Sequence, residues 1–527
     1  RLLAFSEIGM VPAPDPPPPV AEPAPRRASI HSANSSDSAD AVVVALESLG
    51  SSGAEPPPND PTETLVQWMA KIELLNPEHR RAVTAGCALQ WFARPWRIRE
   101  QCYHYSFQTR QIHDFWSHSW RTSVWQKAGL LLIWYNGVAA FLISTLGVFL
   151  VLVLACLGLT PAYSKQPWLG PPLTIGPWCS LTGPLLYSLA FTLWRSRRRV
   201  WLDWICIHQT DMKLQECGLL SLGGNIGNAK SMLILWDETW IERLWCIFEL
   251  ATFLRSHPDA TKNLIILPIF FWPFCVANFW VGFAVGLGNV VLPFNHPLSF
   301  VSGTLGMLLV VFVLEKLMHE FYCSLALLEE RLRKFSLNDA KCACCDNDHK
   351  GPYGQEVRCD RHVLIQVMCL WFGSEAEIES HISTIVADAL REKLLGKFPL
   401  PYWMMVMCQM PVLWAYMDIF AARARDEQWE EAAAVVLDCC SWFLNLIPAI
   451  STFVTCLVRW THSTASCRQT LFRWMSRLAA ILMHVAGQLG VRVCHHYIEN
   501  YLHGKAVFFG ISLLPAFVAW RLRSKSA

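Results

Sequence analysis

The stretch from Arg199 to Arg255 decides the fold. It begins RVWLDWICIHQT and, from Leu219, continues LLSLGGNIGNAKSMLILWDETWIERLWCIFELATFLR. Two short apolar runs in it, Val200–Ile207 and Ser231–Trp236, are bounded by turn-forming residues, which predicts two strands. Because both runs are apolar nearly throughout, they are typical of a parallel sheet that is buried on both faces. The pattern from Glu242 to Leu254 then predicts an amphipathic helix, whose apolar face is Leu244, Ile247, Phe248 and Ala251.

Two carboxylates interrupt this apolar pattern. Asp203 is expected in the middle of the first strand, and Glu249 lies among apolar neighbours on the helix. A buried carboxylate without a partner is unfavourable, or its pKa rises. Ligands of open parallel sheets bind at the carboxyl ends of the strands. We therefore expect Asp203 near that edge, paired with backbone amides of Gly223–Gly227 or with Ser117 or His118; an equally weighted interpretation is that Asp203 only fixes those loops.

The composition is that of a membrane protein. Of 527 residues, 53% are hydrophobic and 16% are charged, whereas soluble chains carry roughly 25% charge. The net charge of +2 gives no reason to expect a nucleic-acid partner. The 20 cysteines are scattered through apolar runs of a long chain, which favours reduced, buried thiols over disulfides.

Long uncharged runs predict an α-helical multi-pass membrane protein with about six to eight spans in a lipid bilayer. Basic clusters at Arg195–Arg199 and Arg459–Arg477 predict that these segments, and with them both termini, are cytosolic, and that Ala421–Val436 lies on the opposite side. The expected spans are Tyr135–Leu159, Ile175–Trp194, Leu264–Leu292, Phe300–Leu317, Pro401–Phe420, Leu437–Val458, Leu478–Cys494 and Ala506–Trp520.

The spans divide the chain into eight segments. Residues 1–59 form a Pro- and Ser-rich tail that is expected to be disordered. Residues 60–110 are expected to be cytosolic and helical, with helices after Asp60 and over Glu78–Phe92. The others are the first part of an α/β module (111–127), a membrane hairpin (128–195), the main part of the module (199–262), a second hairpin (263–322), a cytosolic Cys-rich loop and a helix opened by Ser374–Glu377 (323–400), and the C-terminal spans (401–523).

Four motifs in this order resemble parts of Toll/interleukin-receptor (TIR) homology domains and of the related fungal heterokaryon-incompatibility domains. His113–His118 (HDFWSH) resembles the first TIR strand, and Trp201–Gln209 (WLDWICIHQ) resembles a strand of the incompatibility domains. Leu244–Leu250 (LWCIFEL) resembles the W-C-x-x-E-L helix of TIR domains, and Leu264–Phe270 (LIILPIF) resembles the strand that follows it. Together with the spans, the pattern also resembles multi-pass membrane proteins of protists. The resemblance implies a small cytosolic TIR-like module inserted between membrane segments.

The resemblance also implies roles for individual residues. In TIR domains that cleave NAD, the glutamate of this helix is catalytic, which corresponds to Glu249; Asp203, Ser117 and His118 would then contact the NAD substrate. Such a carboxylate stabilises an oxocarbenium-like transition state. Alternatively, Glu249 pairs with Arg243 or Arg255 and has no catalytic role. Because a membrane hairpin interrupts the module, protein association in signalling is the favoured function, with NAD hydrolysis and a channel or uncoupled transporter gated by the module as alternatives.

A second group of residues has the chemistry of a zinc site. Zn²⁺ in proteins prefers four sulfur or nitrogen ligands. The spacings C-x-C and C-x-x-H predict Cys342, Cys344, Cys359 and His362 as ligands, because adjacent Cys344 and Cys345 are difficult to use together. A Cys-rich loop without metal is the alternative. Cys345 and His349 lie in the same segment and belong to the same constellation.

Overall fold

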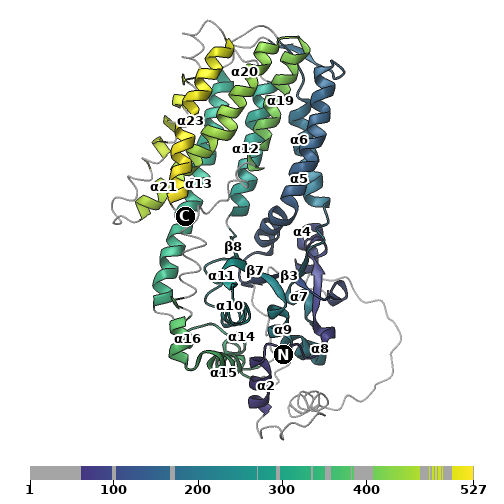
Figure 1. Ribbon diagram of the computed structural model, residues 1–527, viewed down its shortest axis with the longest axis vertical. Coiled ribbons are helices and arrows are strands. Elements are labelled where there is room, and N and C mark those ends of the chain that lie inside the picture. Colours follow the sequence, from purple (N-terminus) through teal and green to yellow (C-terminus); the bar gives the residue numbers. More distant parts are fainter. Residues whose placement is uncertain are drawn as a thin grey trace, which may run out of the picture.

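The computed structural model places an α/β module at one end of an elongated helical bundle (Figure 1). It describes residues 61–97, 102–165, 173–269, 271–291, 297–333, 336–350, 358–381, 383–384, 407–462, 474, 477–479, 481–482, 485–487, 489–490 and 501–525. The expected tail, 1–59, and about half of the expected span Leu478–Cys494 lie outside the described residues.

Six strands form the sheet of the module, in the order β2-β1-β6-β3-β7-β8. Strands β6, β3, β7 and β8 are parallel, and β1 and β2 extend the sheet in antiparallel fashion. By position in the chain the parallel strands read 2-1-3-4, the flavodoxin-like order, in which the chain changes direction between the first and third strands. The strands are β1 (Arg81–Thr84), β2 (Phe107–Gln108), β3 (Ile112–His118), β6 (Arg199–Trp201), β7 (Ala229–Trp236) and β8 (Leu264–Pro268).

The pairing register joins segments that helices of the bundle separate in the sequence. Asp114 lies opposite Val200 on one side of β3, and Ser117 lies opposite Ile234 on the other. The expectation that the segment around Asp114–Ser117 pairs with the strand beginning at Val200 is therefore confirmed. The side chains of β7 are buried from Ser231 to Trp236, as near-continuous apolarity predicts for a central parallel strand.

Helix α10 (Leu244–Ser256) covers the sheet with the expected apolar face, because Leu244, Ile247, Phe248 and Ala251 are all buried. Between β6 and β7 the chain forms helices α7 (Asp203–Cys206), α8 (Met212–Leu220) and α9 (Leu222–Gly227). The expected loop Gly223–Gly227 is thus a buried helix. Glycine is required there, since a Cβ at Gly224 would lie 2.6 Å from the backbone of Glu73, just after helix α2 (Pro61–Ala70).

The expected helix over Glu78–Phe92 is wrong, and residues 60–110 are not purely helical. A short helix η1 (Pro77–His79) is followed by strand β1, by α3 (Ala85–Ala88) and by α4 (Gln90–Arg97). Val83 pairs with Val200 of β6, and Ala82 and Val83 are fully buried. Pairing with a distant strand overrides the local helical preference of this segment.

Helix α5 (Val124–Cys156) belongs to both halves of the molecule (Figure 1). Its first turns, from Lys127 to Ile133, are buried within the module. Its later turns expose large apolar side chains, such as Leu146 (71% exposed) and Phe149 (58%). Helix α6 (Trp178–Leu193) packs against α5 and leads back to β6, so the crossover between two adjacent parallel strands is a helical hairpin of the bundle.

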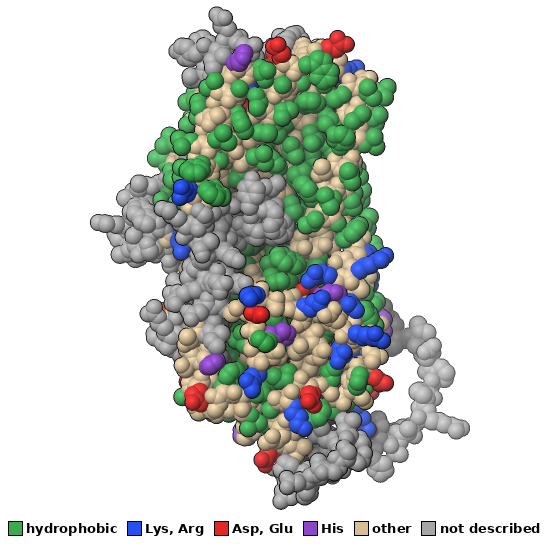
Figure 2. All heavy atoms as spheres, in the orientation of Figure 1, with side chains coloured by type: hydrophobic (Ala, Val, Ile, Leu, Met, Phe, Trp, Pro, Cys, Tyr) green, Lys and Arg blue, Asp and Glu red, His purple; other side chains and the backbone are tan. Residues whose placement is uncertain are grey.

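Four helices in the described part of the chain are long and apolar enough to span a bilayer: Val124–Cys156, Phe271–Val291, Trp429–Arg459 and Leu502–Leu522. In Figure 2 the bundle presents a broad hydrophobic surface, and most Lys and Arg side chains in view lie toward the module. Beside α5 and α6, the bundle contains α12 (Phe271–Val291), α13 (Pro297–Arg333), α19 (Met410–Arg425), α20 (Trp429–Cys439), η5 (Cys440–Leu446), α21 (Ile447–His462) and α23 (Tyr501–Lys525).

Two expected boundaries in the bundle are corrected. The run Leu264–Leu292 begins as strand β8, and only Phe271–Val291 is helical. The segment Ala421–Val436 is not a loop, because α19 and α20 fill most of it and only a short turn joins them. That turn lies at the end of the bundle away from the sheet, where Asp426 accepts a hydrogen bond from the backbone of Thr174 (3.1 Å) in a small hairpin of β4 (Tyr163–Lys165) and β5 (Leu173–Ile175).

A buried carboxylate connects the module to the helical hairpin of α5 and α6. Asp114 is fully buried and accepts two hydrogen bonds of 2.9 Å from the guanidinium of Arg198. It also accepts hydrogen bonds from Ser231 (2.6 Å) and from Tyr135 of α5 (2.8 Å). Burial raises the pKa of Asp114, but these hydrogen bonds and the Arg198 charge outweigh it and hold the pKa below its ordinary value.

Replacing Arg198 by Ala is expected to destabilise the protein strongly, because it leaves the Asp114 charge buried without its cation. Since Arg198 is half exposed and Asp114 keeps two other donors, we expect the low end of the cost of a broken buried pair, about 3 kcal/mol. Lys262→Ala is the matched control, because it removes an exposed pair with Asp259 and should cost less than about 1 kcal/mol. Thermal unfolding in detergent measures both; equal shifts would contradict the assigned role of Arg198.

Candidate functional site

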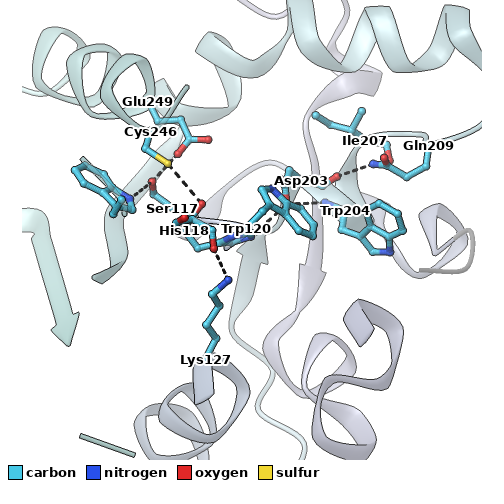
Figure 3. Close-up of polar contacts among 12 residues, drawn as sticks. Ser117, His118, Trp120, Lys127, Asp203, Trp204, Ile207, Gln209, Cys246 and Glu249 are labelled. Atoms are coloured by element: carbon cyan, nitrogen blue, oxygen red, sulfur yellow. Dashed lines mark hydrogen bonds and ion pairs between the residues drawn. The ribbon is translucent and has the colours of Figure 1, made fainter. Parts of the chain in front are cut away.

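Polar side chains gather where strands β3 and β7 end. These two neighbours are the strands between which the chain changes direction, and in this type of sheet the crevice at their carboxyl ends is where ligands bind. Strand β3 supplies Ser117 and His118 there, and the loop after β7 supplies Asp237, Thr239 and Trp240. Helix α10 brings Glu249 to the same place (Figure 3).

Glu249 forms a short hydrogen bond with Ser117. The Ser117 hydroxyl donates to Glu249 Oε2 at 2.5 Å and accepts from Trp240 Nε1 at 3.0 Å. Burial raises the pKa of Glu249 to about 8; the bond from Ser117 opposes this increase, and the charge of Asp203 adds to it. At neutral pH the carboxyl group is therefore largely protonated, so it is suited to donate a proton or to titrate near physiological pH.

Asp203 lies beside this pair but not where the sequence predicted. Strand β6 ends at Trp201, and Asp203 is the first residue of helix α7 rather than a mid-strand residue. Its carboxylate accepts a hydrogen bond from its neighbour's backbone, Trp204 N, at 2.7 Å, which favours a turn of helix over a continued strand. The prediction of a strand over Val200–Ile207 is therefore wrong beyond Trp201.

The expected pairing of Asp203 with His118 is confirmed, and the expected pairing with Gly223–Gly227 amides is not. His118 Nε2 lies 3.5 Å from Asp203 Oδ1, and Trp120 Nε1 donates to Oδ2 at 3.2 Å. Burial lowers the pKa of His118, and the nearby Asp203 only partly restores it. Burial raises the pKa of Asp203, but its hydrogen bonds and His118 lower it further, so Asp203 is the charged member of the contact.

The first turn of α5 is tied to the same edge of the sheet. Lys127 Nζ donates to the backbone oxygen of Ser119, and the Ser119 hydroxyl lies 2.6 Å from that of Thr239. Thr122 donates to Asp237, which also accepts from Thr239 N at 2.7 Å. Lys127, Asp237 and Thr239 were not predicted as site residues from the sequence. The signal for two of them was the polar run Asp237–Thr239, which directly follows a buried strand and therefore lies at the carboxyl edge of the sheet.

The Cys-rich segment forms a second cluster, with a different ligand set from the predicted one. Ligand atoms of Cys344, Cys345, His349 and Cys359 lie within 4.8 Å of one another, and such a cluster could bind a metal such as zinc. Of the predicted ligands, His362 is exposed in the first turn of α15 (Asp360–Phe372) and is outside this group. Cys342 groups with Cys344 and Asp360 instead.

Comparison with known proteins adds no identity to this geometry. No family model, curated protein or solved structure matches the chain. The roles of Glu249, Ser117, His118 and Asp203 therefore rest on the contacts of this structure.

The raised pKa of Glu249 predicts a dependence of stability on pH. In the unfolded chain the group has its ordinary pKa of 4.5, and in the folded protein its pKa is about 8. Because the folded state holds the proton more tightly, this contribution to stability is complete below pH 4.5 and is lost as the pH rises through about 8.

Glu249→Gln, which cannot titrate, should therefore flatten the decline in unfolding temperature between mildly acidic and mildly alkaline pH. Glu238→Gln is the control, since Glu238 is an exposed carboxylate in the loop after β7 and its removal should leave the pH profile as in the wild type. Parallel pH profiles for wild type and Glu249→Gln would show that the carboxyl group titrates normally.

Proposed function

We propose that this chain is a multi-pass membrane protein whose TIR-like module is cytosolic and associates with protein partners in signalling. The observation that carries the proposal is the continuity of helix α5. It begins beside the Ser117–Glu249 edge, where Lys127 is bonded to Ser119, and continues through the bundle to Cys156. A change in contacts at the edge of the sheet therefore acts directly on the first turn of a helix that spans the bundle.

The distribution of basic residues supports a cytosolic module. Arg195–Arg199 joins α6 to β6, at the boundary between the bundle and the module. Basic residues beside membrane spans are concentrated on the cytosolic side. Both termini are then cytosolic, and the turn between α19 and α20 faces the opposite compartment.

Acceptor sites for N-glycosylation test this orientation in the full-length chain. A site inserted after Thr210, in the exposed segment between α7 and α8, should remain unmodified. A site inserted at Gln428, between α19 and α20, should be glycosylated. The reverse pattern would place the module outside the cytosol and would reject cytosolic signalling.

Association with partners is tested by proximity labelling from the full-length chain. Cytosolic proteins labelled by wild type should also be labelled by Glu238→Gln, while Ser117→Ala and Glu249→Gln, which alter the edge of the sheet, should reduce the labelling. Equal labelling by all four proteins would show that association with partners does not involve this site.

NAD hydrolysis is the second candidate, and the Ser117–Glu249 pair is the observation that favours it. The serine holds the carboxyl group at the edge where ligands of such sheets bind, and its pKa of about 8 suits it to proton transfer. In its ionised form, Glu249 would stabilise the oxocarbenium-like ribose as nicotinamide leaves.

If the protein is a hydrolase, the purified full-length chain in lipid nanodiscs should release nicotinamide from NAD. Glu249→Gln should then lower the rate by at least about 100-fold, the usual size of an acid–base contribution. Glu238→Gln should retain the wild-type rate. Wild-type protein that releases no nicotinamide would exclude this activity and leave the binding role.

A further inference from the structure

The Cys-rich segment around helix α14 (Ala343–Asp346) has the geometry of a tetrahedral metal site. Cys345 Sγ lies 3.8 Å from Cys344 Sγ and 3.8 Å from Cys359 Sγ. Zn–S bonds of about 2.3 Å in a tetrahedron place two sulfur ligands about 3.8 Å apart. These pairs of sulfurs therefore already have the spacing that a shared Zn²⁺ requires.

His349 supplies a fourth ligand atom. Its Nε2 atom is buried and has no hydrogen-bond partner, which is unfavourable for a ring nitrogen unless it binds another group. The backbone turns sharply to bring it there, with positive φ angles of 51° at Asp348 and 55° at His349. Such conformations are strained for residues other than glycine and persist where surrounding contacts require them.

We propose that Cys344, Cys345, His349 and Cys359 bind one Zn²⁺ ion in a closed, structural site. Three thiolates and one imidazole are a common structural zinc ligand set. The backbone N–H of Asp360 donates to Cys344 Sγ at 3.2 Å, as a second shell that orients a metal-bound thiolate. Cys342 lies only 3.4 Å from Cys344 Sγ, too close for a second tetrahedral ligand, and is assigned to the outer shell.

The zinc site fastens this segment to the start of helix α10. Backbone bonds join Lys341 N to Glu242 O (2.6 Å) and Leu244 N to Lys341 O (3.1 Å). Asp360, next to the ligand Cys359, accepts a hydrogen bond from Trp245 Nε1 at 3.3 Å. Because these contacts flank both ends of the ligand set, zinc holds the N-terminal turn of α10 in place, and this assignment is independent of the function proposed above.

Metal content of the purified full-length protein tests the ligand set. Wild type should contain one Zn²⁺ per chain, and Cys345→Ser and His349→Ala should lose it. His362→Ala and Cys323→Ser are matched controls, because both residues are exposed and outside the cluster, and they should retain the metal. Metal-free wild type, or loss of zinc from His362→Ala but not from His349→Ala, would overturn the proposal.

A second measurement covers variants that fail to fold. Wild type exchanged with Co²⁺ should show the intense visible bands of tetrahedral cobalt together with thiolate-to-cobalt charge transfer. Removal of the metal by a chelator should increase hydrogen exchange in the first turn of α10 more than in α9, whose described hydrogen bonds do not involve the cluster. An octahedral cobalt spectrum, or unchanged exchange in α10 after zinc removal, would contradict a structural site.

Discussion

The bidentate contact between Asp114 and Arg198 is the interaction on which the arrangement of the two halves depends. Asp114 belongs to the central strand β3, and Arg198 is reached only after the chain has passed through α5 and α6. A buried carboxylate without a cation is costly, so the hairpin must return where Arg198 can pair with it. Tyr135 of α5 donates a hydrogen bond to the same carboxylate and so fixes the position of that helix along its axis relative to the sheet. One carboxylate thereby sets the register of the sheet against the bundle.

This constraint gives a helical hairpin of the bundle the role that a single surface helix has in an ordinary α/β crossover. Parallel strands need a crossover between them, and α5 still packs against the sheet through its first turns before it continues as an apolar helix. Because the helix is uninterrupted from Lys127 onward, the edge of the sheet and the bundle are mechanically joined. Because Lys127 of α5 is hydrogen-bonded to Ser119 at that edge, the contacts made at the edge and the position of the helix depend on each other.

The sequence predicts those parts of the fold whose signal is local. Strand β7 and helix α10 follow from an apolar run and a helical period, and the box Ser374–Glu377 opens helix α16 (Glu375–His381) with the expected reciprocal hydrogen bonds. Strand β1 is set by pairing with β6, which no local pattern encodes. The turn of helix at Asp203 depends on one side-chain hydrogen bond to the backbone. The placement of His349 in the cysteine cluster depends on one sharp turn of the backbone. Sequence motifs pointed to Glu249 and Ser117. Asp237 and Lys127 could be recognised only from the topology, which places them at the same edge of the sheet.

Helix α10 is where the two clusters meet, and its position determines the chemistry of Glu249. Its N-terminal turn is held by the strand-like contact with Lys341, and its middle by stacking of Phe248 on Trp371 of α15. Glu249 lies one residue beyond Phe248, so a small rotation of α10 changes the 2.5 Å contact with Ser117. Loss of that bond removes a hydrogen-bond donor that opposes the effect of burial on the carboxyl pKa, which would then rise further above about 8. The protonation state of Glu249 thus depends on the contacts that hold the N-terminal turn and the middle of its helix.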